Sequence, residues 1–354
     1  MKFLLLLNAL ALLAFLIADL IRNRAKENNT MPAEKKIVFD PKSSSTIKEN
    51  AGYASRSDVS VSSERESLVA MATDTLKTTN QDSYCKRSLA IGGGINILAV
   101  ADGIGSYSSS EYASHFVADY VVNRLADLIE KGENVNFSLV FQDAQKGLVE
   151  YVKKLFAGSL DSIPQNSFGT TLIVGIDYPD RFVAAYVGNG SILHVSSLFS
   201  TFTDAVSMPW NAINLLNPHS IEVRVKEALY KFFAYNANLN DVIPSVVEVI
   251  KNPSMPGEFF VISTDGLHSA DQDVPGMDEA GDMWIPADMR LKHLYDALKT
   301  YLLGKEPLTN EGLDATLRRY LSTIKEAKLI NDDVTLGVVI PQRAIEYSIK
   351  QRSK

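Results

Sequence analysis

Four short acidic motifs are spread along this 354-residue chain, and their carboxylates could bind a divalent cation. They are Asn80-Gln81-Asp82, Ala101-Asp102-Gly103, Ser263-Thr264-Asp265-Gly266 and Asn331-Asp332-Asp333. A single Asp-Gly pair usually marks only a turn. Here two such pairs directly follow apolar runs, so each places a carboxylate at the end of an expected strand. Carboxylates gathered at strand ends repel one another unless a cation neutralises them.

The rest of the composition also favours oxygen ligands for any metal. The chain has one cysteine, Cys85, and five scattered histidines, which excludes an intrachain disulfide and a cysteine-based zinc cluster and leaves no helical histidine pair. Mg²⁺ and Mn²⁺ prefer carboxylate and carbonyl oxygens. The net charge of -7 argues against a nucleic-acid partner, which would normally meet a basic surface.

Hydrophobic patterns predict the elements that must position these motifs. Short apolar runs favour strands, and apolar residues at helical spacing favour helices. We expect the serines at 108–110 to cap a helix that begins near Glu111, and the turn signal Gly188-Asn189-Gly190 to close a hairpin. Tight turns between adjacent strands favour an antiparallel arrangement. The predicted strands are 95–101, 170–176, 182–187, 191–195, 258–263 and 334–340, and further helices are expected at 139–156, 289–303 and 313–327.

The amino terminus reads as a membrane segment followed by a tether. Residues 3–17 are apolar except for Asn8, close to the roughly 17 residues needed to span a bilayer. We therefore expect an anchor at 1–24, with a cleaved signal peptide as the alternative. The basic flank of Arg22, Arg24 and Lys26 would keep the rest of the chain cytoplasmic. A flexible polar linker at 25–67, a globular domain at 68–342 and a tail at 343–354 complete the expected organisation.

The ordered series of motifs from about 71 to 340 resembles the protein phosphatase 2C family. Each motif is short, so the resemblance depends on their order. The matching segments are Asn80-Gln81-Asp82, Val100-Ala101-Asp102-Gly103-Ile104-Gly105, Glu111-Tyr112-Ala113-Ser114, Phe168-Gly169-Thr170-Thr171, Val187-Gly188-Asn189, Ser263-Thr264-Asp265-Gly266-Leu267 and Asp332-Asp333-Val334-Thr335.

The resemblance implies an α+β fold in which two packed antiparallel β-sheets are flanked by helices, with a two-metal site at one end. It implies that Asp102 bridges both metals and that the Gly103 carbonyl joins it at the second. Asp265 and Asp332 would bind the first metal. Asp82 would act in catalysis from the outer shell, by hydrogen bonding to metal-bound waters.

The resemblance also implies the reaction. It is the hydrolysis of phosphoserine or phosphothreonine in proteins, with two Mg²⁺ or Mn²⁺ ions and without a phosphoenzyme. A water held between two divalent ions loses its proton more easily and can attack phosphorus in line. The expected partners are a phosphorylated protein and, through the N-terminal segment, a membrane.

Five positions depart from the family pattern. Lys77 stands where the family usually has an arginine that grips the substrate phosphate, so the charge is kept and the bidentate fork is lost. Asn189 replaces an aspartate that helps bind a third metal, which makes it a weakened ligand position. Gln81, Ile104 and Asp333 replace a metal-binding glutamate, a proposed general-acid histidine and an asparagine. These changes leave open a degenerate binding or regulatory module, and hydrolysis of a small phosphorylated metabolite is a third possibility.

Overall fold

The computed structural model describes residues 67–156, 163–196, 211–223, 226–252, 257–268, 276–277, 283–284 and 286–352. The expected anchor and linker lie outside these ranges. Among the helices that the structure does describe, none is both long enough and apolar enough to cross a bilayer.

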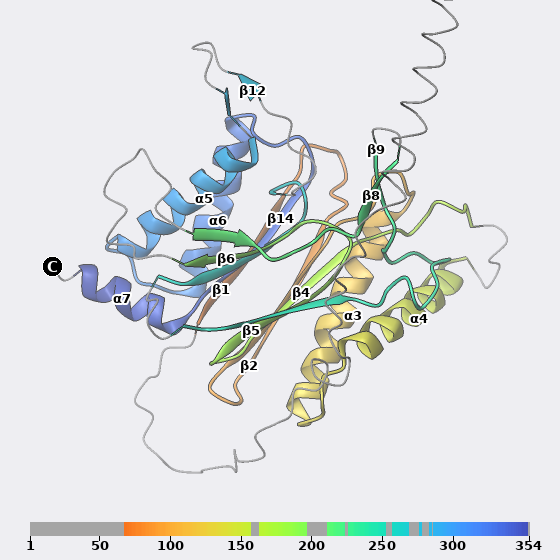
Figure 1. The fold of residues 1–354 in the computed structure, drawn as a ribbon, viewed down its shortest axis with the longest axis horizontal. Helices are drawn as coiled ribbons and strands as arrows, with labels where there is room; N and C mark the ends of the chain where they lie inside the picture. The colour runs from red at the N-terminus through yellow and green to blue at the C-terminus, as the bar shows by residue number, and fades with distance from the viewer. Residues whose placement is uncertain are drawn as a thin grey trace, which may run out of the picture. The chain divides into compact units, whose positions relative to one another are not determined.

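Two five-stranded antiparallel sheets form the centre of the fold (Figure 1). The first has the order β1-β14-β11-β6-β7 and the second β10-β5-β4-β3-β2. The strands of the first sheet are β1 (Leu68–Asp74), β6 (Ser191–Ser196), β7 (Asn211–Asn214), β11 (Phe259–Ser263) and β14 (Val334–Ile340). Those of the second are β2 (Ser83–Leu89), β3 (Ile95–Ala101), β4 (Leu172–Asp177), β5 (Arg181–Val187) and β10 (Ser245–Ile250).

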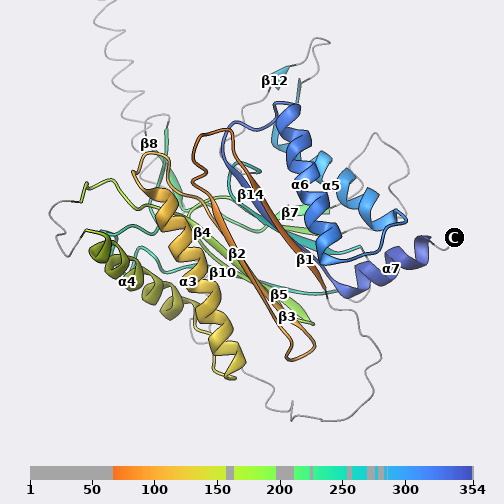
Figure 2. The same ribbon diagram turned by 180° about the vertical axis from the view of Figure 1, so that it is seen from behind.

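Helices cover the outer face of each sheet, so the layers run helix, sheet, sheet, helix (Figures 1 and 2). The second sheet is covered by α3 (Ser110–Glu130) and α4 (Phe137–Leu155). The first is covered by α5 (Pro286–Leu303), α6 (Asn310–Glu326) and α7 (Gln342–Arg352). Small two-stranded pairs are formed by β8 (Ser220–Val223) with β9 (Lys226–Leu229) and β12 (Gly276–Met277) with β13 (Met283–Trp284). The predicted fold class is confirmed.

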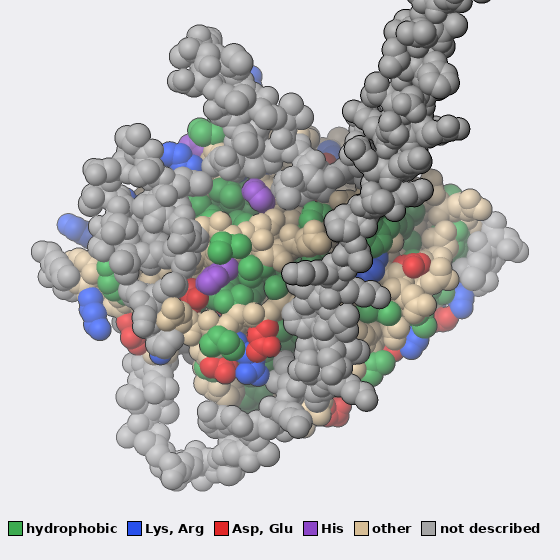
Figure 3. Space-filling view, viewed as in Figure 1, with side chains coloured by type: hydrophobic (Ala, Val, Ile, Leu, Met, Phe, Trp, Pro, Cys, Tyr) green, Lys and Arg blue, Asp and Glu red, His purple; other side chains and the backbone are tan. Residues whose placement is uncertain are grey.

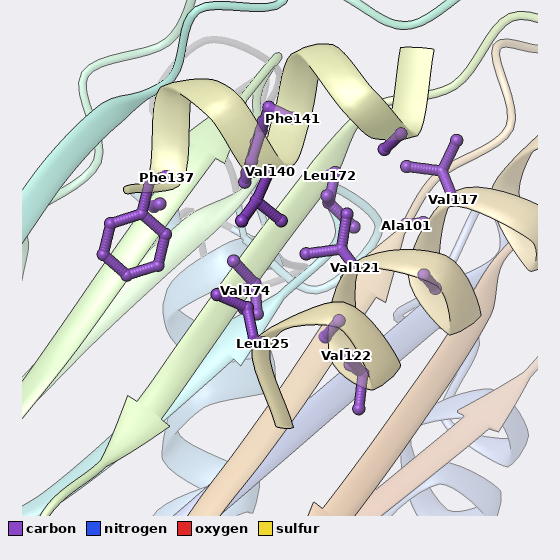
Figure 4. Close-up of a cluster of buried hydrophobic side chains, with 14 of the residues drawn as sticks. Ala101, Val117, Val121, Val122, Leu125, Phe137, Val140, Phe141, Leu172 and Val174 are labelled. Carbon is purple, nitrogen blue, oxygen red and sulfur yellow. The ribbon is translucent and has the colours of Figure 1, made fainter. Parts of the chain in front are cut away.

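Buried apolar side chains join these layers. Figure 4 shows one cluster, in which side chains of α3 and α4 meet Ala101, Leu172 and Val174 of the second sheet. Between the two sheets, the rings of Phe182 and Phe260 stack with centroids 4.5 Å apart. Both rings are almost fully buried. Strands that are buried on both faces explain the continuous apolar runs in the sequence.

The strand predictions are confirmed to different degrees. The expected strands at 95–101 and 334–340 match β3 and β14 in both bounds. The predicted hairpin at Gly188-Asn189-Gly190 is wrong, because β5 belongs to the second sheet and β6 to the first. Gly188 and Gly190 have φ values of 107° and 114° and carry the chain from one sheet to the other. A turn signal shows that the chain changes direction, but it cannot show whether the flanking strands pair.

The predicted serine cap of α3 is also wrong. Ser109 precedes the helix with a left-handed φ of 59° and makes no side-chain capping bond. The neighbouring serines are engaged elsewhere: the Ser108 backbone pairs with Asn166 and Phe168, and the Ser110 hydroxyl accepts a hydrogen bond from the Gln81 amide. These contacts hold α3 against the loops that surround Asp102.

The segment 343–354, expected to be a tail, includes most of α7, so the folded part extends to residue 352. Ala344 and Ile345 are buried in the cluster beneath α5 and α6. The Arg352 guanidinium donates hydrogen bonds to the carbonyls of Tyr301, Leu302 and Glu306. The short apolar pattern of this segment gave too weak a periodicity to predict the helix.

The Phe182–Phe260 stack offers a test of the packing between the sheets. Phe260→Ala should lower the free energy of unfolding by about 3–5 kcal/mol, because it removes a buried ring and leaves a cavity. Urea denaturation of the full-length protein would measure this. Ile213→Ala, at an exposed position on β7, is the matched control and should change stability by no more than about 0.5 kcal/mol. Equal effects of the two substitutions would contradict the inter-sheet contact.

Candidate active site

The acidic motifs meet at one end of the sandwich. Asp102 directly follows β3, Asp265 lies two residues after β11, and Asp332 lies two residues before β14. Because β14 is antiparallel to β11, the start of one strand lies at the same end of the sheet as the finish of the other. The two sheets therefore bring together carboxylates that are far apart in the sequence, with Asp102 and Asp332 separated by more than 200 residues.

A pocket of about 160 Å³ opens at this end and contains most of the predicted site residues. Asp102, Gly103, Asp265, Asp332, Lys77 and Asn189 all line it. Ile104, Gly105, Thr171, Ser220 and Leu229 complete the wall. Asp82 does not line the pocket but lies beneath it, with a relative exposure of 6%. The structure thus brings the predicted residues together, while their individual roles stay predictions.

Two threonines fix the backbone of Asp102. The Thr171 N–H and the Thr170 hydroxyl both donate to the Asp102 carbonyl, each at 2.8 Å. The Asp102 N–H in turn donates to the Thr171 hydroxyl at 3.1 Å. The Phe168-Gly169-Thr170-Thr171 motif therefore holds the backbone that carries Asp102. Gly169 is required because an added Cβ would lie 2.7 Å from the Tyr107 ring.

Asp82 is held by the strands that carry the other carboxylates. Its Oδ2 accepts a hydrogen bond of 2.7 Å from the Thr264 hydroxyl, next to Asp265. Thr264 and Thr335 exchange further hydrogen bonds across β11 and β14. The other carboxylate oxygen of Asp82 is buried and has no hydrogen-bond partner among the described residues. That oxygen is available to accept from a water molecule at the floor of the site.

Lys77 is anchored by two adjacent carboxylates. Its ammonium contacts Asp332 directly and lies 3.5 Å from Asp333. Asp333 is buried and also accepts from the Thr75 hydroxyl and the Gln81 N–H. Burial alone would lower the pKa of Lys77, but Asp332 and Asp333 more than offset it and raise the pKa above its ordinary value. Lys77 therefore stays charged at the rim of the pocket.

Gln81 serves the structure of the loops around the site. Its Nε2 donates to the Ser110 hydroxyl at 2.7 Å, and its Oε1 accepts from Lys77 at 3.3 Å. Its backbone carbonyl accepts from the Gly103 N–H and the Ser114 hydroxyl. A Cβ at Gly103 would lie 2.6 Å from that carbonyl, so only glycine permits this approach. The residue thus links the first motif to the loop after Asp102.

The turn at Asn189 ends beside Asp265. The Asn189 Nδ2 donates to the Asp265 Oδ2 at 2.9 Å. An amide that donates to this carboxylate stabilises its negative charge without a cation. Gly266, the next residue along, lies so close to Asp333 that an added Cβ would be 1.9 Å from its carbonyl oxygen. Both Asp-Gly pairs therefore owe their glycines to close backbone contact as well as to turn geometry.

Burial, with crowding of like charges, raises the pKa values of Asp102 and Asp82. Burial raises the pKa of Asp102 well above its ordinary value, and the negative charges of Asp265 and Asp82 add to this shift. Burial also raises the pKa of Asp82 to about 7, although the hydrogen bond from Thr264 opposes the change. Ionising these groups is costly unless positive charge is brought close to them.

The donor chemistry of the pocket fits a hard divalent cation. Its ligands would be carboxylates and the Gly103 carbonyl, which Mg²⁺ and Mn²⁺ favour over softer donors. Among the described residues, no three acidic, histidine or cysteine side chains converge closely enough to hold an ion by themselves. Mg²⁺ usually keeps several water molecules among its ligands.

Several site residues were missed from the sequence. Ser220 and Leu229 line the pocket from the β8–β9 hairpin, in a region where no motif could be aligned. His219 lies at the base of this hairpin, and burial lowers its pKa to about 4, with a smaller contribution from Lys231. A lone histidine in a weakly patterned segment gives no sequence signal. Thr264, by contrast, belongs to a motif that was recognised.

The surface charge gives no indication of a nucleic-acid partner, whose absence stays a prediction. On the coloured part of the face in Figure 3, basic side chains are scattered among acidic and hydrophobic ones and form no continuous basic area. This view covers one face only. The net charge of -7 gives the same indication for the whole chain.

A family model described as "Protein phosphatase 2C" matches residues 75–322. This range contains every predicted site residue except Asp332, which lies just beyond it. Comparison with curated proteins found no match.

Solved structures with similar folds include a bacterial serine phosphatase, with 16% identity over 77% of this chain and 97% of that one, at a TM-score of 0.47. A serine/threonine phosphatase from S. agalactiae has 16% identity over 78% of this chain and 99% of that one, at a TM-score of 0.46. The catalytic domain of PstP, in complex with 2 manganese ions, has 14% identity over 77% and 98%, also at 0.46. At these low identities and scores, the family model carries the assignment. The chain belongs to the protein phosphatase 2C family and is a protein-serine/threonine phosphatase.

Proposed function

We propose that the chain hydrolyses phosphoserine and phosphothreonine in proteins with two divalent cations, Mg²⁺ or Mn²⁺, held around Asp102. The observation that carries this proposal is the pocket that gathers Asp102, Asp265 and Asp332 at the ends of strands from two sheets. When bound there, the cations would acidify a water molecule for attack on phosphorus and offset charge on the phosphoryl oxygens.

The protein's own residues would then orient the reactants. Asp102 and the Gly103 carbonyl would hold the cations from one sheet, and Asp265 and Asp332 from the other. The second carboxylate oxygen of Asp82 would accept a hydrogen bond from a water molecule at the floor of the site. Lys77, charged and at the rim, would attract the substrate phosphate. Ile104 offers no proton, so the leaving oxygen would take its proton from solvent.

One observation favours the alternative of a binding or regulatory module. The Lys77 ammonium lies directly on Asp332, a proposed metal ligand, and Asn189 donates to Asp265, another one. Both contacts offset part of the negative charge on these two carboxylates, which a cation would otherwise offset. Asp102, which is partly buried and lines the pocket, has no such contact with Lys77 or Asn189 among the hydrogen bonds and ion pairs of the described residues. Its surroundings therefore favour a bound cation and the enzymatic proposal.

Asp102→Asn tests this proposal. The variant should lose metal-dependent hydrolysis of a phosphothreonine peptide and of para-nitrophenyl phosphate by at least about 100-fold, a loss of roughly 2.7 kcal/mol in transition-state stabilisation. Steady-state kinetics with and without Mn²⁺ would measure this, with circular dichroism to verify folding. Wild-type rates in the variant would contradict the bridging role.

The same variant should be more stable than the wild type when no metal is present. The raised pKa of Asp102 means that the folded state binds its proton more tightly than the unfolded state does. Wild-type stability should therefore fall as pH rises from acid toward the raised pKa, and the asparagine variant should lack this contribution. Melting curves over a series of pH values from about pH 4 upward would show the difference, which should grow as the pH rises toward the raised pKa. Added Mn²⁺ should raise the Tm of the wild type only.

Lys77 offers a separate test of phosphate binding. Lys77→Ala should reduce kcat/KM by about 10–100-fold, the loss expected for a charged hydrogen bond of about 1.5–3 kcal/mol. Lys77→Arg should keep or improve kcat/KM, because the guanidinium can bind phosphate through two hydrogen bonds. Identical kinetics in all three proteins would show that Lys77 serves only as a surface cation.

We also propose that the N-terminal segment anchors the enzyme to a membrane with the catalytic domain in the cytoplasm. The register of β1 against β14 places the entry of the chain away from the pocket. Leu68 pairs with Ile340, which lies at the end of β14 opposite to Asp332. The chain therefore enters the first sheet away from the pocket. A flexible linker of about 40 residues would extend over a few tens of Å, with end-to-end distance growing as the square root of length.

Cell fractionation tests the anchor. The full chain should sediment with membranes, and protease added from outside the cell should leave the catalytic domain intact. Replacing three leucines of the segment, Leu5, Leu6 and Leu7, with aspartates should release the protein into the soluble fraction, because charged side chains are costly in a bilayer. A secreted mature chain that lacks the segment would support the signal-peptide alternative instead.

A further inference from the structure

His219 lies between two parts of the pocket wall. It directly precedes β8, and it packs beside the turn that follows β5. Its backbone N–H donates to the Gly188 carbonyl at 3.0 Å, and its Nδ1 accepts from the Gly188 N–H at 3.2 Å. One buried residue thus satisfies both backbone groups of Gly188.

The hydrogen bonds define the tautomer of the ring. A backbone N–H can only donate, so Nδ1 must carry the lone pair and Nε2 the proton. Nε2 therefore donates to the Ser245 hydroxyl on β10 at 3.0 Å. The ring also stacks on Tyr186, with centroids 5.0 Å apart. These contacts fix the imidazole from its edge and its face.

The same residue closes the base of the β8–β9 hairpin. The Tyr230 N–H, just after β9, donates to the His219 carbonyl at 2.9 Å. In the register of the hairpin, Ser220 and Leu229 are paired, and both line the pocket. His219 therefore determines where this wall begins.

On its other side, His219 acts on the turn that carries Asn189. An added Cβ at Gly188 would lie 2.6 Å from Thr171, so this position cannot be held by a side chain of its own. Instead, the His219 Nδ1 accepts a hydrogen bond from the Gly188 N–H. The next residue, Asn189, donates to Asp265. A continuous set of contacts thus leads from the hairpin base to a carboxylate of the pocket.

We propose that His219 is a positioning residue that fixes the Asn189 turn and the β8–β9 hairpin relative to each other, and so maintains the pocket around Asp265. The proposal rests on the proposed phosphatase function for its kinetic test, but not for its structural test. His219 does not line the pocket, so its effect on the reaction passes through Gly188, Asn189 and the hairpin.

Two polar substitutions in the full-length protein separate the contacts. In His219→Asn, the side-chain oxygen can take the place of Nδ1 and accept from Gly188. In His219→Gln, the longer amide reaches toward Ser245 and leaves the Gly188 N–H without its acceptor. His194→Asn is the matched control, because His194 pairs with Glu258 and stacks on Phe260, away from the pocket.

Hydrogen exchange without metal gives the structural readout. Amide exchange in segment 186–191 should accelerate by about tenfold or more in His219→Gln, because a lost hydrogen bond makes local opening easier. It should stay close to wild type in His219→Asn and in His194→Asn. Unchanged exchange in His219→Gln, or equal acceleration in both His219 variants, would overturn the positioning role.

Kinetics with a phosphothreonine peptide and Mn²⁺ give the second readout. His219→Gln should lower kcat/KM by about tenfold, and His219→Asn should restore most of it, whereas His194→Asn should lower the Tm without this loss. Wild-type kcat/KM in His219→Gln would overturn the link to the pocket. If the wild-type protein shows no hydrolysis while the exchange pattern appears as expected, the proposed function fails and the positioning role stands.

Discussion

Like charges that are buried together repel one another, and the pocket of this protein holds several of them. Asp102 is partly buried in the pocket wall, and the charges of Asp265, Asp82 and Asp332 all act on it. Such a cluster cannot form on a flexible scaffold, because the chain would separate the carboxylates. The two sheets oppose that separation, since Asp102, Asp265 and Asp332 each lie within two residues of a strand that is buried in the sandwich.

The scaffold positions these carboxylates through their backbones more than through their side chains. The two threonines just before β4 hold the Asp102 main chain. Gly103 and Gly266 let neighbouring carbonyls approach closely. This arrangement satisfies the N–H and C=O groups around the carboxylates and fixes the backbone that carries them. Rigid placement of donors is the condition for electrostatic stabilisation of a reacting phosphate.

The sequence predicted features that depend on local pattern and missed those that depend on distant contacts. Continuous apolar runs defined β3 and β14 because both strands are buried on both faces. The turn at Gly188-Asn189-Gly190 was recognised, but the separation of β5 and β6 into two sheets was not, because it depends on their other neighbours. Ordered motifs located Asp102, Asp265 and Asp332, whereas Ser220, Leu229 and His219 carry no local signal.

Two departures from the family pattern, at Asp333 and Asn189, are each accompanied by contacts that offset the change in charge. Asp333 adds a buried negative charge, but its oxygens accept from Thr75 and Gln81 and face the Lys77 ammonium. Asn189 removes a negative charge, and its amide supports Asp265. Each change thus comes with a contact that stabilises it.

A substitution at Lys77 alone would remove a positive charge that offsets the negative charge of Asp333. The substitution would therefore change both the stability of the protein and its binding of phosphate, and the two effects have to be separated by measuring both. The same reasoning explains why changes that weaken individual ligand positions need not dismantle the site: the carboxylate at its centre, Asp102, is held by Thr170 and Thr171, which none of these departures touches.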